Sequence, residues 1–250
     1  MKIKHTLTAV SVALLTIGGR AFAEDQPDDP WRYSITLPLQ APRIDGNVTV
    51  ASIKENVNVD FDKLREHLQD AASLAFGVGK QQYGFFGDIG YMRFTGGGGP
   101  RSYELKFLIG DLGGYYRIAK VGEERPLILS VTGGGRFWYT DTSFSDSNIG
   151  LSGGKARNLE QPVIGLRATQ VFTPKLHLDM MSDVGGFNIG YDTDSTWSAA
   201  GVLTYDFTKW FSLSGGYKAV NVDVMNGHDL GQNGINIIIH GPVVLLSFKF

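Results

Sequence analysis

Apolar and polar residues alternate with a period of two along much of this chain. In 31–40 the odd positions hold aromatic or aliphatic residues, and the even positions hold polar residues or proline. The last seven residues repeat the pattern. One face carries Val244, Leu246, Phe248 and Phe250, and the other carries Leu245, Ser247 and Lys249. Successive side chains of a strand point to opposite faces, so both stretches predict β-strands with one apolar face.

Ten stretches predict strands in this way. They lie near 31–40, 73–80, 83–94, 103–119, 127–140, 161–172, 176–189, 197–207, 211–224 and 235–250. Short connections alternate with medium or long ones, and the strand number is even, as in up-and-down membrane barrels. We therefore predict an all-β protein, an antiparallel up-and-down transmembrane β-barrel of ten strands at 31–250. Eight strands are the alternative, if the pair at 73–80 and 83–94 forms something else. The final strand is expected to pair with 31–40 and close the wall.

One stretch has helical spacing. Within 60–72 the apolar residues are three or four positions apart with charges between them, and Asp60 suits an N-cap. We expect a short amphipathic helix on the first external loop, 42–72. The alternative is a helix that folds into the barrel mouth as a partial plug. Ile44–Val50 predicts a further hairpin arm in this loop, and 141–160 predicts a second long loop.

The first 23 residues predict a cleaved signal peptide. Lys2 and Lys4 precede an apolar stretch, Leu7–Ile17, that is too short to span a bilayer. Ala21-Phe22-Ala23 then fits a small-x-small cleavage site. Residues 24–30 would form an N-terminal periplasmic segment, and the protein would reside in the cell outer membrane of a Gram-negative bacterium.

Composition excludes several classes. Three of the 23 Lys and Arg residues and none of the 25 acidic residues lie in the signal segment, so the mature net charge is about −5, which does not suit a nucleic-acid-binding surface. The chain has no cysteine, which rules out disulfides and a lipid-anchored cysteine. After residue 23 no apolar run reaches the ~18 residues of a spanning helix.

The charged residues of the predicted strands share one face. A charge that faces lipid at mid-membrane costs about 2–4 kcal/mol for Arg or Lys, so the charged face should line the lumen. Both signs occur, which predicts a network of ion pairs that fills a narrow barrel; a selective conduction path is the alternative. The predicted lumen residues are Asp88, Asp111, Arg117, Arg136, Arg167, Asp179, Asp183 and Lys218, with Asp206 and Lys249 on the same face.

Aromatic residues near the strand ends predict interfacial girdles, in which amphipathic rings lie at the level of the lipid headgroups. They are Trp31, Tyr83, Tyr91, Tyr115, Tyr116, Tyr205, Trp210, Phe211 and Tyr217.

Several motifs resemble a family of proteobacterial outer-membrane β-barrel proteins, most of which have no assigned activity. The resemblance is best over 161–250, in Gln161–Arg167, Ser182–Phe187, Trp197, Gly215–Lys218 and the ending after Gly241-Pro242. Phe86–Met92 and Gly134–Trp138 are similar as well. The resemblance implies a small barrel and an outer-membrane location, without an activity. Leu246, Phe248 and Phe250 are then the expected barrel-assembly signal, and the partners are outer-membrane lipid and the assembly machinery, with a monomeric barrel.

Function is expected to be structural or that of a narrow pore. A barrel enzyme acting on lipid or peptide would need a nucleophile and a base within hydrogen-bond reach. Of the mature histidines His67, His177, His228 and His240, only His228 lies near acids that suggest a base–carboxylate pair, Asp223 and Asp229. No nucleophile motif accompanies it, so we do not expect an enzyme.

A soluble periplasmic ligand carrier of the lipocalin kind is a further alternative. That architecture turns its apolar face inward, whereas here the charges occupy the face expected to point inward. Two loop clusters could offer oxygen ligands to calcium, although turn chemistry explains them better and we expect no metal or cofactor. They are Asp141, Ser143, Asp146 and Asn148, and Asp192 and Asp194.

Overall fold

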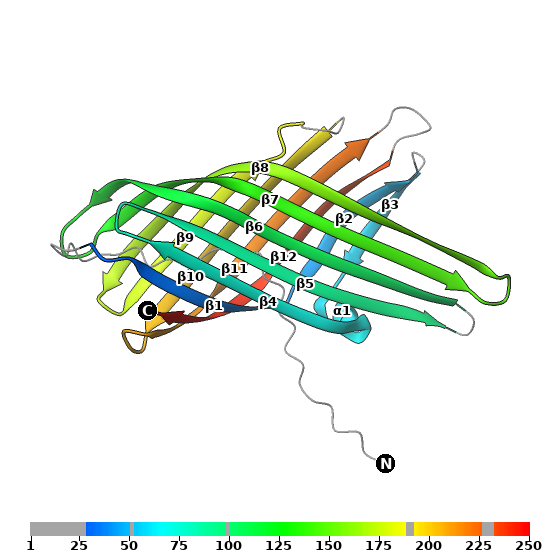
Figure 1. Cartoon of the computed structure of the whole chain (residues 1–250), viewed down its shortest axis with the longest axis horizontal. Coiled ribbons are helices and arrows are strands. Elements are labelled where there is room, and N and C mark those ends of the chain that lie inside the picture. Colours follow the sequence, from blue (N-terminus) through cyan, green and yellow to red (C-terminus); the bar gives the residue numbers. More distant parts are fainter. Residues whose placement is uncertain (1–28, 51–52, 99–100, 189–192, 227–232) are drawn as a thin grey trace, which may run out of the picture.

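A single antiparallel sheet closes on itself in the computed structural model, which describes residues 29–50, 53–98, 101–188, 193–226 and 233–250 (Figure 1). The signal segment predicted at 1–23 lies outside these residues. The first five strands are β1 (Arg32–Gln40), β2 (Arg43–Val50), β3 (Ile53–Val59), β4 (Leu68–Gly79) and β5 (Tyr83–Gly98). They are followed by β6 (Arg101–Val121), β7 (Leu127–Asp146), β8 (Leu151–Thr173), β9 (Leu176–Gly185), β10 (Thr193–Asp206), β11 (Phe211–Asn226) and β12 (Asn233–Lys249).

The first and last strands close the wall, as predicted. β1 pairs with β12 from Ser34 opposite Lys249 to Gln40 opposite Val243. At the end of the chain, Tyr33 and Phe250 exchange both backbone hydrogen bonds, at 3.1 and 2.9 Å. Phe250 thus completes the ladder and leaves no free edge at this end of the barrel.

The barrel has ten long strands, which confirms that prediction over the eight-stranded alternative. β2 continues the path of β1, because β12 pairs first with β1 and then, from Arg43 opposite His240, with β2. These two segments therefore act as one strand, and β4 to β12 supply the other nine. The short β3 pairs with β2 and forms with it the hairpin expected near Ile44–Val50.

The predicted loop at 141–160 is wrong. β7 continues to Asp146 and β8 starts at Leu151, so only the turn Ser147–Gly150 connects them. The glycine-rich stretch 95–98 also belongs to a strand, since β5 runs to Gly98 and β6 starts at Arg101. Figure 1 shows these strands reaching beyond their neighbours. Most described side chains of 151–160 are exposed, so the apolar period disappears there while the backbone ladder continues.

The helix is shorter than predicted. α1 spans Phe61–His67, and 68–72 belongs to β4. Asp60 has the extended backbone of an N-cap, but its side chain makes no cap hydrogen bond. Leu64 packs with Met92 and Phe94 of β5, which share the inward face of Asp88. This contact with the inner face favours the partial plug over a helix that lies only on the external loop. No helix in the described ranges is long and apolar enough to span a bilayer.

Candidate functional site

The predicted lumen residues all lie on the inner face of the barrel. Strand alternation sets this face, and outward-facing neighbours such as Leu112, Leu166 and Val184 are half exposed. None of the predicted residues is more than 9% exposed: Asp88, Asp111, Arg117, Arg136, Arg167, Asp179, Asp183 and Lys218. Asp206 is buried on the same face.

Arg136 is the centre of the inner charge network. Its Nε donates to Asp111 Oδ1 at 2.8 Å and its Nη2 to Asp111 Oδ2 at 3.1 Å. The same guanidinium reaches Asp183, two strands away, at 3.0 and 3.1 Å. Ser198 donates a short hydrogen bond to Asp183. One arginine therefore ties β6, β7 and β9 together, and the bidentate geometry makes this the strong form of ion pair.

Asp88 and Lys218 border this network from opposite sides. Asp88 lies directly opposite Asp111 in the β5–β6 register, and Lys218 comes from β11. Both are buried, and neither Asp88 carboxylate oxygen has a hydrogen-bond partner among the described residues. A buried carboxylate without a partner is costly. The hydrogen bonds of the network are therefore concentrated between Arg136, Asp111 and Asp183, and none of them reaches Asp88.

A second polar cluster lies nearer the chain terminus. Asp179 accepts a hydrogen bond from Thr169 at 2.5 Å and contacts Arg167 at 3.5 Å and His177 at 3.2 Å. Lys249 donates a short hydrogen bond to Asp206 in the same half of the barrel. The sequence pattern placed the charged members of these groups inside but did not show which of them meet.

An apolar layer lies on the outer side of the charge network. Trp138 and Ile109, on β7 and β6, pack in one cluster with Val220, Val222 and Ile239 of β11 and β12. In the sheet, β8 to β10 separate β7 from β11, and β1, β4 and β5 separate β6 from β12, so the cluster crosses the lumen. The sequence analysis did not find this layer, since it assigned apolar residues to lipid. Apolar residues at lumen-parity positions, such as Val220 and Val222, are the signal that would have found it.

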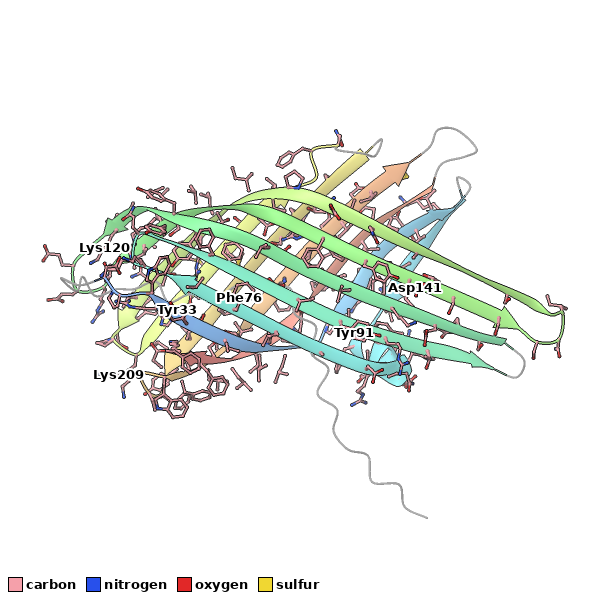
Figure 2. The ribbon with its side chains drawn as sticks, viewed as in Figure 1. Tyr33, Phe76, Tyr91, Lys120, Asp141 and Lys209 are labelled. Atoms are coloured by element: carbon pink, nitrogen blue, oxygen red, sulfur yellow. The ribbon has the colours of Figure 1, made fainter. Side chains whose placement is uncertain are left out.

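Exposed apolar side chains cover the outside of the wall. Figure 2 shows Phe76 in the middle, Tyr33 in the half that ends in Lys120 and Lys209, and Tyr91 in the opposite half. Of the predicted girdle residues, Tyr115 turns inward and donates to the Lys80 carbonyl at 3.2 Å, so it is not a girdle residue. Trp31, Tyr83, Tyr116, Tyr205, Trp210 and Tyr217 are exposed, and Tyr91 and Phe211 are partly exposed.

Ion pairs lie on the outside of the wall at the end of the barrel where Tyr91 and Asp141 lie (Figure 2). Arg93 binds Asp70 at 2.6 Å and approaches Glu104 at 3.7 Å; Lys106 binds Glu104 at 2.8 Å and approaches Asp141 at 3.8 Å. These residues alternate with inward-facing ones such as Met92 and therefore face outward. We call Asp70, Arg93, Glu104, Lys106 and Asp141 the outer ion ladder.

Two histidine–carboxylate pairs correct the expectation that only His228 could form one. Besides His177–Asp179 in the lumen, His240 Nε2 lies 2.9 Å from Asp45 Oδ2, and Tyr217 Oη lies 2.5 Å from His240 Nδ1. His240 thus joins β2 to β12 and, through Tyr217, to β11, while Arg43 donates to Asp45 at 2.8 Å within β2. The i, i+2 spacing of His177 and Asp179 on one strand face was a signal in the sequence. His228 and Asp229 lie outside the described residues.

The solved structures that this arrangement resembles are outer-membrane barrels. The match to the outer membrane protease OmpT from Escherichia coli has a TM-score of 0.50 at 14% identity and covers 90% of this chain and 98% of that one. Ail, the attachment invasion locus protein of Yersinia pestis, matches with a TM-score of 0.41 at 12% identity, over 88% and 99% of the two chains. The translocator domain of the autotransporter NalP from Neisseria meningitidis gives 0.40 at 14%, over 90% of each chain.

This chain has the fold of a bacterial outer-membrane β-barrel. No family model matches it, and no curated protein matches it either. At such low identities the likeness concerns the fold alone, so the role of this barrel must be argued from its own residues.

The other residues singled out in the sequence are the C-terminal assembly signal and the suggested calcium ligands. Leu246 and Phe248 lie in β12, and the Phe250 side chain is 73% exposed just beyond it. Of the suggested calcium ligands, Asp141 belongs to the outer ion ladder, while Ser143 and Asn148 are exposed. The side chains of Asp146 and Asp194, and Asp192 as a whole, lie outside the described part of the chain.

Proposed function

We propose that this protein is an integral barrel of the bacterial outer membrane, closed to solutes along its axis, with a structural role. It spans the membrane as a monomer surrounded by outer-membrane lipid, and the assembly machinery recognises Leu246, Phe248 and Phe250 at its C-terminus. The observation that carries the proposal is the buried ion-pair network of Arg136 with Asp111 and Asp183 on the inner face. The apolar layer around Trp138 adds a second barrier to ions.

A barrel of this size supports a closed interior on general grounds. Small barrels leave room for little more than their own side chains, whereas 16 to 18 strands are needed for a wide aqueous channel. Here the interior contains two polar clusters and an apolar layer, whose side chains are mostly buried, with Lys249 partly exposed. A dry apolar layer is a barrier to ions because an ion that crosses it loses its hydration.

A narrow pore is the second candidate function. It is favoured by Asp88, whose buried carboxylate oxygens have no hydrogen-bond partner within the described residues, and by Lys218, which interacts electrostatically with Asp88. This side of the network could open without breaking the ion pairs of Arg136. Under this alternative, ions would pass between β5 and β11 along the inner wall.

Hydrolytic activity is not part of the proposal. In the lumen, the Thr169 hydroxyl donates to Asp179, the same carboxylate that His177 contacts. A hydroxyl engaged with a carboxylate is not activated by the imidazole, as nucleophilic catalysis requires. At the outer site, His240 is engaged by Asp45 and Tyr217 on its two ring nitrogens.

Single-channel recording on the refolded protein in planar bilayers tests the role. We expect no discrete conductance from the wild type. Replacing Asp88 by Asn and Lys218 by Met then leaves the bilayer silent. Wild-type steps whose amplitude changes with Asp88→Asn would establish the narrow pore instead. Heat-modifiable migration and recovery in the outer-membrane fraction test the location, and recovery as a soluble periplasmic protein would refute it.

A further inference from the structure

The hydrogen-bonded wall is interrupted on one side of the barrel. β1 pairs with β4 only from Arg32 opposite Gly79 to Thr36 opposite Ala75. From there β4 continues alongside β5 up to Leu68, while β1 and β2 continue alongside β12. In the described residues β3 pairs only with β2, so no strand pairs with the outer half of β4 on this side.

Two prolines account for the interruption. The backbone N–H groups of Tyr33 and Ala41 donate to Phe250 and Pro242, so the N–H groups of the odd residues point toward β12. The N–H groups of the even residues therefore point toward β4. After Thr36 these are Pro38, Gln40 and Pro42, and proline has no N–H to donate.

The contact that follows confirms this geometry. Continuing the register would place Pro38 opposite Ser73, and the Ser73 side chain donates to the Pro38 carbonyl at 2.8 Å. A side-chain hydroxyl thus contributes the last bond at the point where the ladder stops. We call the region between 38–42 and 68–74 the seam.

The seam reaches the outer edge of the apolar surface. Leu74 and Leu37 face outward on its two sides and are 44% and 40% exposed. Above it, Asp70 pairs with Arg93 in the outer ion ladder. A seam between exposed leucines and an ion ladder lies at the depth of the outer-leaflet acyl chains, next to the headgroups. Free strand edges in hydrocarbon are costly unless something covers them.

A second apolar surface lies on the inner face of the wall, directly behind the seam. Met92 and Phe94 form its buried part, and Leu64, Leu68, Ala71, Leu105 and Phe107 pack around them. Leu68 reaches this inner surface because the β4–β5 register shifts between Leu68 and Asp70. α1 lies against the same surface through Leu64, and no residue of the helix is buried, so the cover is light.

We propose that the seam is a lateral portal, through which one acyl chain of an outer-leaflet lipid reaches the apolar surface of Met92 and Phe94 beneath α1. The surrounding membrane supplies this occupant, because the material next to Leu74 and Leu37 is acyl chain. The portal is independent of axial conduction. It rests on the proposed membrane location, and the experiment separates the two.

The chain has no cysteine, so single nitroxide labels can be placed without removing any residue. Ala71→Cys reports on the inner surface behind the seam. Ala75→Cys is the matched control, on the same strand and face but opposite Thr36 where the wall is intact. Phe76→Cys faces lipid. In lipid vesicles we expect the Ala71 label to be accessible to oxygen, which dissolves in acyl chains, and the Ala75 label to be inaccessible.

Each outcome decides the question. If Ala71 is as inaccessible to oxygen as Ala75 while Phe76 is accessible, the portal is refuted and the membrane location stands. If Phe76 itself is inaccessible, the location fails. Because a label at Ala75 could prevent folding, crosslinking by lipids with a diazirine on the acyl chain is measured in the unlabelled protein. Crosslinks at Leu64, Ala71 or Met92 support the portal, and crosslinks confined to outward residues such as Leu74 and Phe76 overturn it.

The prolines supply a gain-of-pairing test. The variant with Pro38→Ala and Pro42→Ala restores two N–H donors on the β4 side. We expect loss of the inner crosslinks with retention of those at Phe76. Inner crosslinks that persist unchanged in this variant would overturn the portal, because acyl chains would then reach the surface by another route.

Discussion

Arg136 and Asp111 lie directly opposite each other in the β6–β7 register and form a two-point ion pair, with Nε–Oδ1 at 2.8 Å and Nη2–Oδ2 at 3.1 Å. The same guanidinium contacts Asp183 at 3.0 Å. A single cation therefore balances two buried acids on different strands. Removing it would leave both acids uncompensated inside the barrel, which is costly.

We predict that Arg136→Ala destabilises the barrel by about 3–5 kcal/mol, the cost of breaking a buried ion pair by removing one partner. Arg93→Ala is the matched control, since it removes an arginine from an ion ladder at the surface, where such pairs contribute about 1 kcal/mol or less. Urea unfolding of the refolded protein in lipid vesicles measures both. Equal losses in the two variants would contradict the central role of Arg136.

Close approach of β6 and β7 depends on Gly134. A Cβ at this position would lie 2.2 Å from the Leu112 carbonyl oxygen, whereas one at Gly133 would have no atom nearer than 4.0 Å. We predict that Gly134→Ala costs about 1–3 kcal/mol through overpacking and that Gly133→Ala changes stability little. The same unfolding measurement compares the two neighbours, and similar losses would argue against the close approach.

Asp45 of β2 anchors the external hairpin to β12 through His240. We predict that Asp45→Ala speeds amide hydrogen exchange in β2 and β3 and leaves β6 to β9 unchanged, because the lost His240 contact joins only the hairpin to the wall. Global stability should change by about 1 kcal/mol or less, as expected for exposed pairs. Asp62→Ala, which removes an exposed pair with Arg65 within α1, is the control. Exchange that rises equally in both variants would refute the anchor.

Phe250 separates assembly from stability. Its side chain is 73% exposed, and its bonds to Tyr33 are made by the backbone. We predict that Phe250→Ala refolds in vitro with nearly wild-type stability and yet yields much less folded barrel in the outer membrane of cells. Heat-modifiable migration measures both. Val244→Ala on the same strand face is the control, and equal yields for the two variants would show that Phe250 is not an assembly signal.

Period-two alternation was enough to predict the ten strands and the face of every predicted lumen charge. Asp88, Arg136 and Asp183 occupy positions of opposite parity to the lipid-facing residues, and a charge facing lipid is costly. The same reasoning failed at 141–160, because water on both sides of a strand removes the pattern. It also missed Trp138 and Val220, since an apolar side chain inside a barrel looks the same in sequence as one outside.

The sequence by itself determined the closing strand, the composition of the inner face and the positions of Pro38 and Pro42. Only the tertiary structure decided which charges meet, because Arg136 and its partners are 25 and 47 residues apart and come together through strand register. Register also decided which edge the two prolines face. A proline removes one hydrogen-bond donor wherever it lies, but only the pairing of neighbouring strands shows that the missing donors belong to the side of β4.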